Sequence, residues 1–393
     1  MNLLTFSLPN QLAEVAFFLA ALVLIALSNL KALKRLEVLA LQQPRLDQAP
    51  RVSILVPARN EEKTIVQCIK SLLAQDYPDF EVLALDDCSQ DYTVELLDGL
   101  AAQDGRLRVL HGQVLPPGWL GKHWACYQLA EAASGELLLF TDADTRHHPQ
   151  ALREAVGVLI GERADFLSAW PRQEVLTWGE RLVVPLIYWA FLAFVPLALA
   201  YRTRITALTA AIGQFMLIRR AAYEQVGGYA AIRNHTADDL ALARRVNAAG
   251  LRWLALDGGN RVSCRMYTSF EQAFQGVSKN LFPAFDYRLL PFIFVWIWLG
   301  VVFLEPLVVL VAAVLGGPLP PSAIKMAGLA VAMALLLWSL ALGRLRFPFW
   351  IALAYPLILA LAMVIAFESL ALNLAGKATW KGRTLARPAI RWF

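Results

Sequence analysis

The sequence contains little cysteine, and none of it follows a spacing typical of a metal module or a disulfide framework. The four cysteines, Cys68, Cys88, Cys126 and Cys264, include no C-x-x-C pair and have no histidine companions at ligand spacing. Structural zinc sites need closely spaced ligands, and small secreted folds need paired cysteines. We therefore expect reduced thiols in a domain that faces the cytosol.

A dinucleotide fingerprint is also missing, and charge is scarce. No G-x-G-x-x-G string follows a predicted strand, which disfavours a dinucleotide cofactor. Charged residues make up 17% of the chain and the formal net charge is +5. Much of the basic excess flanks apolar runs, as at Lys31, Lys34 and Arg35, where such clusters orient membrane helices. The charge therefore indicates a membrane partner and no nucleic acid.

Long apolar runs are abundant, and they concentrate at the two ends of a chain that is 58% hydrophobic. From Leu12 to Leu30 the only charge is Glu14. A membrane-spanning helix needs about 20 mostly apolar residues, so we predict an anchor here. A cleaved signal peptide is the alternative, but its basic residues would precede the apolar run instead of following it.

Further apolar segments follow, at Leu289–Gly316, Ile324–Leu342 and Phe347–Leu374. Buried core helices are the alternative, but runs this long and poor in charge favour the membrane. Leu182–Ala200 contains two prolines and is flanked by arginines, so we predict helices that lie in the membrane interface there. The predicted division is an anchor (1–35), a catalytic domain (36–288, with interfacial helices at 182–200), membrane segments (289–376) and a basic tail (377–393).

The distribution of basic residues predicts a multi-pass protein of the inner membrane. No Lys or Arg precedes the first apolar run, whereas three follow it, so the catalytic domain is expected in the cytoplasm. Three further crossings would put the basic tail outside. We therefore expect that one C-terminal segment does not cross, and Glu305-Pro306 in the middle of Leu289–Gly316 favours that segment.

Between the apolar ends, short β-rich runs alternate with helical stretches. This alternation predicts an α/β fold with a mainly parallel sheet covered by helices. The predicted strands are Val52–Val56, Glu81–Leu85, Leu107–Leu110 and Glu136–Phe140, and the helices between them are Glu62–Ala74, Tyr92–Gln103 and His123–Ala133. Chemistry in such sheets lies at the carboxyl ends of the strands.

Clusters that contain polar residues stand at those strand ends. They are Pro57-Ala58-Arg59-Asn60-Glu61 after the first strand, Asp86-Asp87 after the second, and Asp142-Ala143-Asp144 after the fourth. Two carboxylates at this spacing suit a Mg²⁺ or Mn²⁺ ion shared with a diphosphate. The spacing alone is a weak signal, because D-x-D also occurs by chance in turns and helix caps.

Two aspartate pairs allow two interpretations each. Asp86-Asp87 either caps the following helix or accepts hydrogen bonds from the base or ribose of a nucleotide. Asp238-Asp239 precedes a helical run from Leu240 to Ala249, where acids favour the helix N-terminus. Alternatively, one member of this pair deprotonates an acceptor hydroxyl. The local signal leaves both alternatives open.

Taken together, four motifs resemble the family 2 glycosyltransferases with a GT-A fold. They are Val52-Ser-Ile-Leu-Val-Pro-Ala-Arg-Asn-Glu-Glu62, Asp86-Asp-Cys-Ser89, Thr141-Asp-Ala-Asp144 and Ala237-Asp-Asp-Leu240. The resemblance implies an inverting transfer from a nucleotide sugar, most simply a UDP-sugar. It also implies that Asp87 contacts the nucleotide with Asp86 beside it, that Asp142 and Asp144 hold the metal and diphosphate, and that Asp239 is the general base. The donor site is expected to include Pro57, Ala58, Arg59 and Glu61 as well. Asp238 stands where the family usually has glutamate.

Other segments resemble the lipid-directed members, including hopanoid-associated and carotenoid-type (diaponeurosporenoate) glycosyltransferases. They are Pro117–Trp124, Cys264–Tyr267, Lys279-Asn280 and Trp380–Arg383. The resemblance implies a lipid acceptor and a contact of Lys122 with donor phosphates, although a solvated loop lysine is the alternative.

One departure from the family concerns polymerisation. The Q-x-x-R-W string of the processive polysaccharide synthases is absent, and Lys279 takes its place as a candidate partner of the leaving diphosphate. We therefore expect the transfer of one sugar to a lipid-like acceptor. A polysaccharide synthase and an inactive membrane scaffold are the alternatives.

Overall fold

The computed structural model describes residues 3–43, 48–377, 379–380, 383–384 and 390–392. Most of the predicted basic tail, including Lys381 and Arg387, lies outside these residues. The predicted domain boundaries stay predictions.

A seven-stranded sheet with the order β3-β2-β1-β4-β8-β6-β9 forms the centre of the fold. All neighbouring strands are parallel except β8, which runs antiparallel to both β4 and β6. The mainly parallel sheet expected from the sequence is thus confirmed. The strands are β1 Val52–Ala58, β2 Phe80–Asp86, β3 Leu107–His111, β4 Leu137–Phe140, β6 Phe166–Trp170, β8 Met216–Arg219 and β9 Trp253–Asp257.

The central strands are apolar along their whole length because both faces of the sheet are covered. Ile54 belongs to one hydrophobic cluster and its neighbour Leu55 to the other, as expected when successive side chains point to opposite faces. The larger cluster continues into the long apolar helices. The covering helices are α3 Ile65–Leu73, α4 Thr93–Ala101, α5 Gly121–Ala132, α6 Ala151–Gly161 and α10 Asp238–Ala248.

A smaller sheet, in the order β5-β10-β7, lies at the end of β4. It consists of β5 Thr145–His147, β7 Arg172–Gln173 and β10 Val262–Cys264. The register pairs Thr145 with Cys264, which brings the segment after β4 next to β10. The remaining short elements are α2 Leu36–Ala40, α8 Leu197–Ala200, α9 Arg220–Gln225, β11 Thr379–Trp380, β12 Arg383–Thr384 and the 3-10 helices Thr206–Leu208, Tyr229–Ile232, Pro283–Phe285 and Phe349–Ala354.

Four helical stretches among the described residues are long and apolar enough to cross a membrane. They are Leu8–Ala32, Leu289–Val314, Pro321–Arg344 and Phe349–Leu374. They correspond to α1 (Leu3–Ala32), the consecutive helices α12 (Leu289–Phe303) and α13 (Glu305–Val314), α14 (Pro321–Arg344), and α15 (Tyr355–Leu374) with the turn before it. These stretches coincide with the apolar runs found in the sequence.

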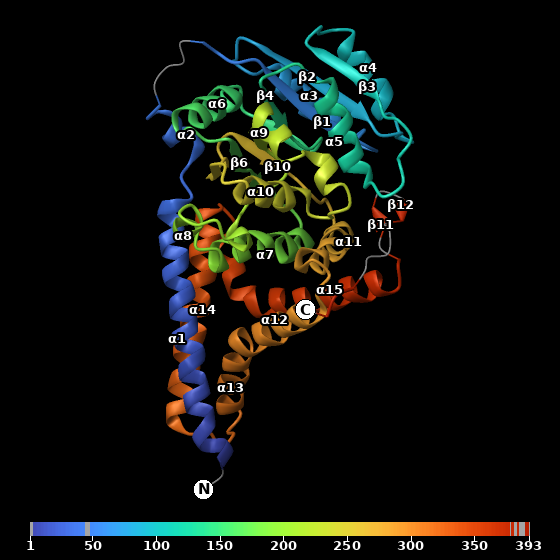
Figure 1. The fold of residues 1–393 in the computed structure, drawn as a ribbon. Coiled ribbons are helices and arrows are strands. Elements are labelled where there is room, and N and C mark those ends of the chain that lie inside the picture. The colour runs from blue at the N-terminus through green and yellow to red at the C-terminus, as the bar shows by residue number, and fades with distance from the viewer. Residues whose placement is uncertain (1–2, 44–47, 378, 381–382, 385–389, 393) are drawn as a thin grey trace.

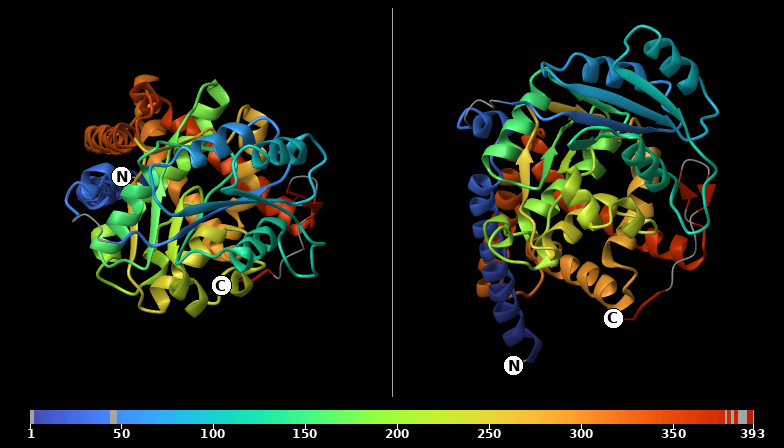
Figure 2. Two further views of the ribbon diagram at one scale, coloured as in Figure 1. Left: turned by 90° about the horizontal axis from the view of Figure 1, so that it is seen from above. Right: turned by 45° about the horizontal axis from the view of Figure 1, so that its top comes forward.

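The long helices form two groups. Helices α1 and α14 pack side by side and extend away from the sheet, with α13 against α14, whereas α15 lies across the bottom of the sheet domain (Figure 1). The turned views show α1 and α14 together at one edge of the molecule (Figure 2). Glu305 begins α13 and accepts a hydrogen bond from Gln11 Nε2 of α1 at 2.8 Å, which pairs the one charge in the stretch formed by α12 and α13.

Helices α7 (Trp178–Phe194) and α11 (Phe270–Leu281) form a layer between the sheet and α15 (Figure 1). Helix α7 contains Pro185 and is not among the membrane-length stretches. The predicted position of residues 182–200 in the membrane interface stays a prediction.

Two contacts connect the sheet domain to the chain that follows it. The buried Asp257 carboxylate at the end of β9 pairs with Arg344, the last residue of α14, and lies 3.6 Å from Arg346 Nη1. Near the C-terminus, Arg391 N donates to Tyr287 O at 3.0 Å, and Leu289 N donates to Arg391 O at 2.8 Å. Residues 390–392 therefore lie beside the start of α12.

Candidate active site

The parallel register brings the polar strand ends together at one edge of the sheet. Ala58 is paired with Asp86 at the ends of β1 and β2, and Leu55 is paired with Phe140 at the end of β4. The Asp87 amide donates to Ala58 O at 2.8 Å, which continues the pairing beyond the strands. The loops after these strands therefore share one edge, as the sequence predicted.

Hydrogen bonds connect the loops that follow β1 and β2. The Arg59 guanidinium donates to the carbonyl oxygens of Asp87 and Cys88, and the Asn60 amide donates to Ser89 Oγ at 2.9 Å. Asn60 and Cys88 both have left-handed backbones, with φ of 53° and 55°. Such conformations cost energy and concentrate at functional sites, where the surroundings hold them in place.

The structure shows what surrounds Asp86 and Asp87. Both side chains are buried, and the Asp86 carboxylate accepts a hydrogen bond from Ser89 N at 3.1 Å within the same loop. Asp91 instead accepts the hydrogen bond from Thr93 N, the first residue of α4, at 3.1 Å. Asp91 thus satisfies the first N–H group of the helix, and the nucleotide-binding role of Asp86 and Asp87 stays a prediction.

Asp142 and Asp144 lie in the turn between β4 and β5. The Thr145 hydroxyl donates to Asp142 O at 2.7 Å and shapes this turn. Asp144 Oδ1 is buried and has no hydrogen-bond partner within the described part of the chain. Burial first, and then the charges of Asp142 and Glu61, raise the pKa of Asp144 to about 7.

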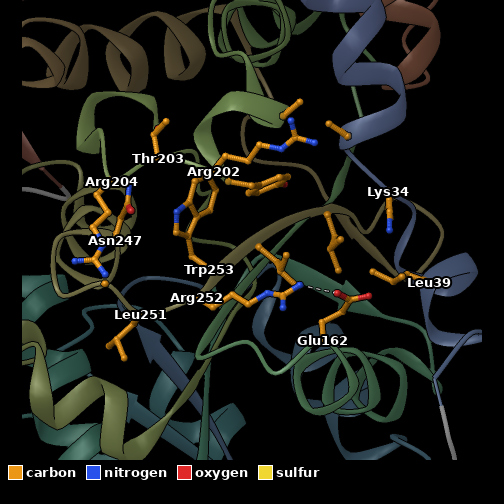
Figure 3. Close-up of a pocket in the computed structure, with 16 residues that line it drawn as sticks. Lys34, Leu39, Glu162, Arg202, Thr203, Arg204, Asn247, Leu251, Arg252 and Trp253 are labelled. Carbon is orange, nitrogen blue, oxygen red and sulfur yellow. Dashed lines mark hydrogen bonds and ion pairs between the residues drawn. The ribbon is translucent and has the colours of Figure 1, made fainter.

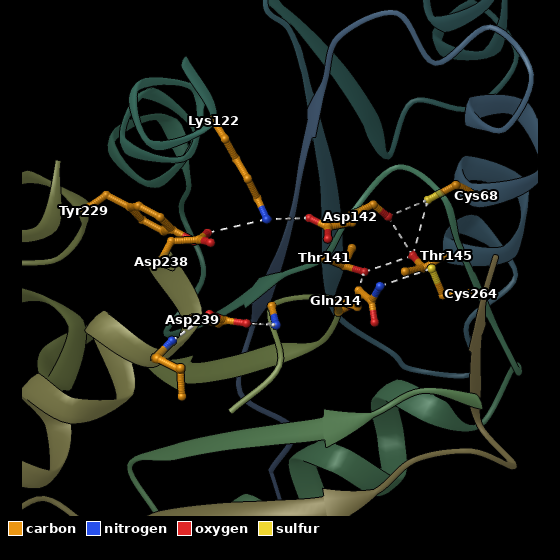
Figure 4. A network of polar contacts seen from close by, with 12 residues as sticks. Cys68, Lys122, Thr141, Asp142, Thr145, Gln214, Tyr229, Asp238, Asp239 and Cys264 are labelled. Atoms are coloured by element: carbon orange, nitrogen blue, oxygen red, sulfur yellow. Dashed lines mark hydrogen bonds and ion pairs between the residues drawn. The ribbon is translucent and has the colours of Figure 1, made fainter. Parts of the chain in front are cut away.

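Lys122 on α5 bridges the D-x-D segment and α10. Its Nζ lies 2.8 Å from Asp142 Oδ1 and 3.4 Å from Asp238 Oδ2 (Figure 4). Burial alone would lower the pKa of Lys122, but the two carboxylates hold it well above its usual range. The lysine is therefore a charged member of the site and not a solvated loop residue.

Asp238 and Asp239 begin α10, so the helix starts two residues before its predicted first turn. Asp239 accepts hydrogen bonds from Gly213 N at 3.1 Å and Leu240 N at 2.7 Å. Burial, followed by the neighbouring charge of Asp238, raises the pKa of Asp239 to about 6.

The pKa of Asp238 is shifted in the opposite direction. Burial would raise its pKa, but Lys122 and the Tyr229 hydroxyl, which donates to Oδ2 at 3.1 Å, lower it below its usual range. Adjacent acids with separated pKa values are typical of sites in which each acid has a different role. Asp239, which titrates closer to neutrality, has the properties of a general base.

The sequence analysis missed several residues that form hydrogen bonds around the aspartates of the site. Gln214 precedes β8, and its side-chain Nε2 donates to Cys264 Sγ at 3.2 Å. Its backbone carbonyl oxygen accepts a hydrogen bond from the Thr141 hydroxyl at 2.8 Å. Gly213, Gln214 and Tyr229 all lie outside the motifs recognised in the sequence. The only local signal was the position of Gly-Gln directly before an apolar strand.

Three further residues were predicted to bind the donor, namely Glu61, Pro57 and Lys279. Glu61 Oε2 accepts a hydrogen bond from the Thr64 hydroxyl at 3.0 Å, and Pro57 is paired with Leu85 within the sheet. Lys279 lies on α11, which packs against α7 and α15. The contacts of these residues with a donor stay predictions.

The carboxylates fit a shared divalent cation better than a complete protein cage. Among the described residues, no three His, Cys, Asp or Glu side chains are grouped to hold a metal ion. Asp142 and Asp144 supply two carboxylates, and Asp144 Oδ1 lacks a partner among the same residues. Such a set suits Mg²⁺ or Mn²⁺, which commonly take their other ligands from phosphate groups and water.

Comparison with known families identifies the domain that carries this site. Residues 53–227 match the family described as Glycosyl transferase family 2. The chain therefore contains a glycosyl transferase family 2 domain, and the family expected from the motifs is confirmed.

Individual relatives include proteins named for lipid substrates. The chain is 24% identical over 233 residues to 4,4'-diaponeurosporenoate glycosyltransferase from Staphylococcus haemolyticus, a match that covers 58% of this chain and 60% of that protein. It is 29% identical over 205 residues to beta-monoglucosyldiacylglycerol synthase from Nostoc sp., a match that covers 50% of this chain and 41% of that protein. The chain thus spans about half the length of these curated relatives.

A solved structure shows the same fold over nearly the whole chain. Mannosyltransferase PcManGT from Pyrobaculum calidifontis, determined with GDP-Man and Mn²⁺, superposes with a TM-score of 0.50 and 19% identity. The match covers 95% of this chain and 100% of that one. The GT-A-type fold is thereby confirmed.

Proposed function

We propose that this chain is an inverting glycosyltransferase that moves one sugar from a nucleotide-sugar donor to a lipid-like acceptor at the membrane. One observation carries the proposal: the D-x-D segment, the charged Lys122 and the half-buried base candidate Asp239 meet at one edge of a GT-A-type sheet. The membrane-length helices attached to this sheet supply a place for an apolar acceptor.

The donor is proposed to lie over the ends of β1, β2 and β4. Asp86 and Asp87 are proposed to bind the nucleoside, and a UDP-sugar is the first candidate donor. Asp142 and Asp144 would hold Mg²⁺ or Mn²⁺, which neutralises charge on the leaving diphosphate. PcManGT binds GDP-Man together with Mn²⁺, and this supports a nucleotide sugar and a divalent cation for the present chain. Lys122, whose Nζ lies 2.8 Å from Asp142 Oδ1, would contact the diphosphate.

Asp239 is proposed to take the proton of the acceptor hydroxyl while the oxygen of that hydroxyl attacks the anomeric carbon. The bond between this carbon and the diphosphate breaks in the same displacement, so the anomeric configuration inverts. The hydrogen bond from the Gly213 amide fixes the direction of the carboxylate. The raised pKa of Asp239 suits proton abstraction near neutral pH.

A lipid-like acceptor is supported by the names of the relatives, one a diaponeurosporenoate glycosyltransferase and the other a diacylglycerol glucoside synthase. Inner-membrane location and a cytoplasmic catalytic domain are part of the proposal, because nucleotide sugars are made in the cytosol.

The product tests this function. Purified protein in detergent is incubated with Mn²⁺, a lipid extract and UDP- or GDP-hexoses, and the lipids are analysed by mass spectrometry. We expect a lipid that gains the mass of one hexose, and no such product from Asp239→Asn. A ladder of several hexoses, or no glycosylated lipid with any donor, would refute the single-sugar transfer.

A further inference from the structure

A cavity of about 620 Å³ lies at the opposite edge of the sheet from β3, beside the edge strand β9. Its walls come from the link after α1, from the loop after α8 and from the first residues of β9 (Figure 3). None of the carboxylates at the ends of β1, β2 and β4 lines it. It is thus a separate site from the one described above.

The cavity is strongly basic. Lys34, Arg202, Arg204 and Arg252 line it, and Glu162 is the acid among its described lining residues. Arg252 Nη2 lies 2.8 Å from Glu162 Oε2, so this pair is neutral as a whole. In the part of the chain that the structure describes, Lys34, Arg202 and Arg204 have no acidic side chain within ion-pair distance. Three positive charges thus remain around one cavity.

The lining is held in place by the edge of the sheet. The Asp257 amide of β9 donates to Lys34 O at 2.8 Å, which fixes the link after α1 against the strand. The Tyr201 hydroxyl donates to Ala255 O at 3.0 Å, and the Tyr201 ring centroid lies 5.0 Å from that of Trp253. The basic side chains therefore extend from a fixed backbone.

Two details concern the polar groups of the lining. Thr203 Oγ1 is buried and has no hydrogen-bond partner among the residues described, although this threonine lines the cavity. Gly250 has φ of +75°, and a Cβ there would come within 2.9 Å of Arg204 Nη2. The absence of a side chain at Gly250 thus leaves space for the Arg204 guanidinium. A buried hydroxyl without a partner is costly unless a ligand or water satisfies it.

The position of the cavity indicates the source of the ligand. Lys34 follows α1, which ends at Ala32 and is long and apolar enough to cross a membrane. Ala198 of the apolar helix α8 lies in the same lining. Basic pockets at the cytoplasmic ends of membrane helices are suited to acidic lipid head groups. The cavity combines this location with apolar walls.

We propose that this cavity binds the phosphate of an anionic phospholipid, with Arg202, Arg204 and Lys34 around the phosphate and the Thr203 hydroxyl as an additional donor. The inference depends on α1 lying in a membrane and not on the proposed transfer reaction. The bound lipid would fix the height and tilt of the sheet domain at the membrane surface.

Native mass spectrometry of the detergent-purified full chain tests the proposal, without any sugar donor. Phosphatidylglycerol is titrated against wild-type protein, Arg202→Gln/Arg204→Gln and Lys63→Gln/Lys70→Gln, in which two exposed lysines of another surface lose their charge. We expect one tightly retained phosphatidylglycerol in the wild type and in the control. Retention by the Arg202/Arg204 variant should be at least about tenfold weaker.

Further measurements distinguish a lipid phosphate from a free phosphate compound as the ligand. Phosphatidylcholine should bind more weakly than phosphatidylglycerol, and glycerol phosphate should not displace the lipid. Thr203→Val should weaken retention, whereas Thr203→Ser should preserve it. Equal retention by the Arg202/Arg204 variant and the wild type would overturn the site. Displacement by glycerol phosphate at concentrations equal to those of the lipid would overturn the lipid as its ligand.

Discussion

At the scale of single residues, the site depends on how differently two neighbouring aspartates are surrounded. Asp238 faces the charge of Lys122 and the hydroxyl of Tyr229, which favour its ionised form. Asp239 accepts only backbone amides among the hydrogen bonds that the structure gives for its side chain, and its neighbour is negative. The second acid is therefore the better proton acceptor near neutral pH.

Asp239→Asn should reduce transfer by about 10²–10⁴-fold, because general-base catalysis typically contributes that factor. Donor affinity should change little, since the carboxylate is proposed to act on the acceptor. Initial rates and donor binding are measured on the same preparation. Glu224→Gln, an exposed charge on α9, is the control. Near-normal turnover in Asp239→Asn would remove this residue from the mechanism.

The pH dependence of kcat/KM should report the same carboxylate. Because the pKa of Asp239 is raised to about 6, the active ionised form is present above this pH and is lost as the pH falls through it. The rate at pH 5 should be about tenfold below the plateau. Asp238→Asn removes the neighbouring charge and should move the inflection to lower pH. An inflection near pH 4 in the wild-type enzyme would contradict the assignment.

Asp144→Ala should weaken metal-dependent binding of the nucleoside diphosphate. Loss of even an outer-shell partner of a metal typically costs about 10–100-fold in metal affinity or activity, and a ligand should cost at least as much. Calorimetry with the diphosphate, with and without Mn²⁺, measures the effect, and the exposed Asp98→Ala is the control. Unchanged metal-dependent affinity in Asp144→Ala would make the D-x-D a structural turn.

At the scale of elements, Asp257 couples the sheet to the long helices. Its side chain is 4% exposed and pairs with Arg344, itself 9% exposed, while Arg346 lies close by. Removal of one partner from a buried pair leaves an uncompensated charge. Because these residues come from β9, the end of α14 and the turn after it, the pairs connect the edge of the sheet to the helical part.

Asp257→Ala should therefore destabilise the protein by about 3 kcal/mol. Asp104→Ala is the matched control, because it breaks an ion pair with Arg106 at 2.7 Å that lies at the surface. Such exposed pairs contribute about 0–1 kcal/mol. Thermal unfolding in detergent compares the two variants. Equal melting temperatures would show that the Asp257 cluster does not hold the two parts together.

The strands with a clear local signal were predictable, and the connections between distant elements were not. β1, β2 and β4 are apolar runs followed by polar residues, which the sequence displays directly. β8 has four residues and runs antiparallel, and nothing local marks its direction. The ion pairs of Lys122 join residues far apart in the sequence, so the bridge between D-x-D and α10 could not be read from spacing.

At the scale of the whole molecule, the described C-terminal residues favour an even number of membrane crossings after the catalytic domain. Arg391 hydrogen-bonds to Tyr287 and Leu289, so both ends of the segment between them lie on one side of any membrane. Helix α13 leads away from the sheet and α14 leads back toward it, whereas α15 lies across the bottom of the sheet domain (Figure 1). We therefore expect α15 to be the segment that does not cross, in place of Leu289–Gly316.

Cysteine labelling with an impermeant reagent in intact cells tests this arrangement. Leu315→Cys, in the exposed turn after α13, should be labelled from outside. Trp392→Cys should react only after the cells are opened. Labelling of Trp392→Cys in intact cells would place the C-terminus outside and would contradict the even number of crossings.

The central claim is that the D-x-D edge and Asp239 transfer a sugar to a lipid. The most direct measurement is the release of nucleoside diphosphate from a panel of UDP- and GDP-sugars by purified protein, with and without a lipid extract. The account predicts release that requires both lipid and a divalent cation and that falls at least about 10²-fold in Asp239→Asn. Release that is equal in Asp239→Asn, or that does not depend on lipid, would contradict it.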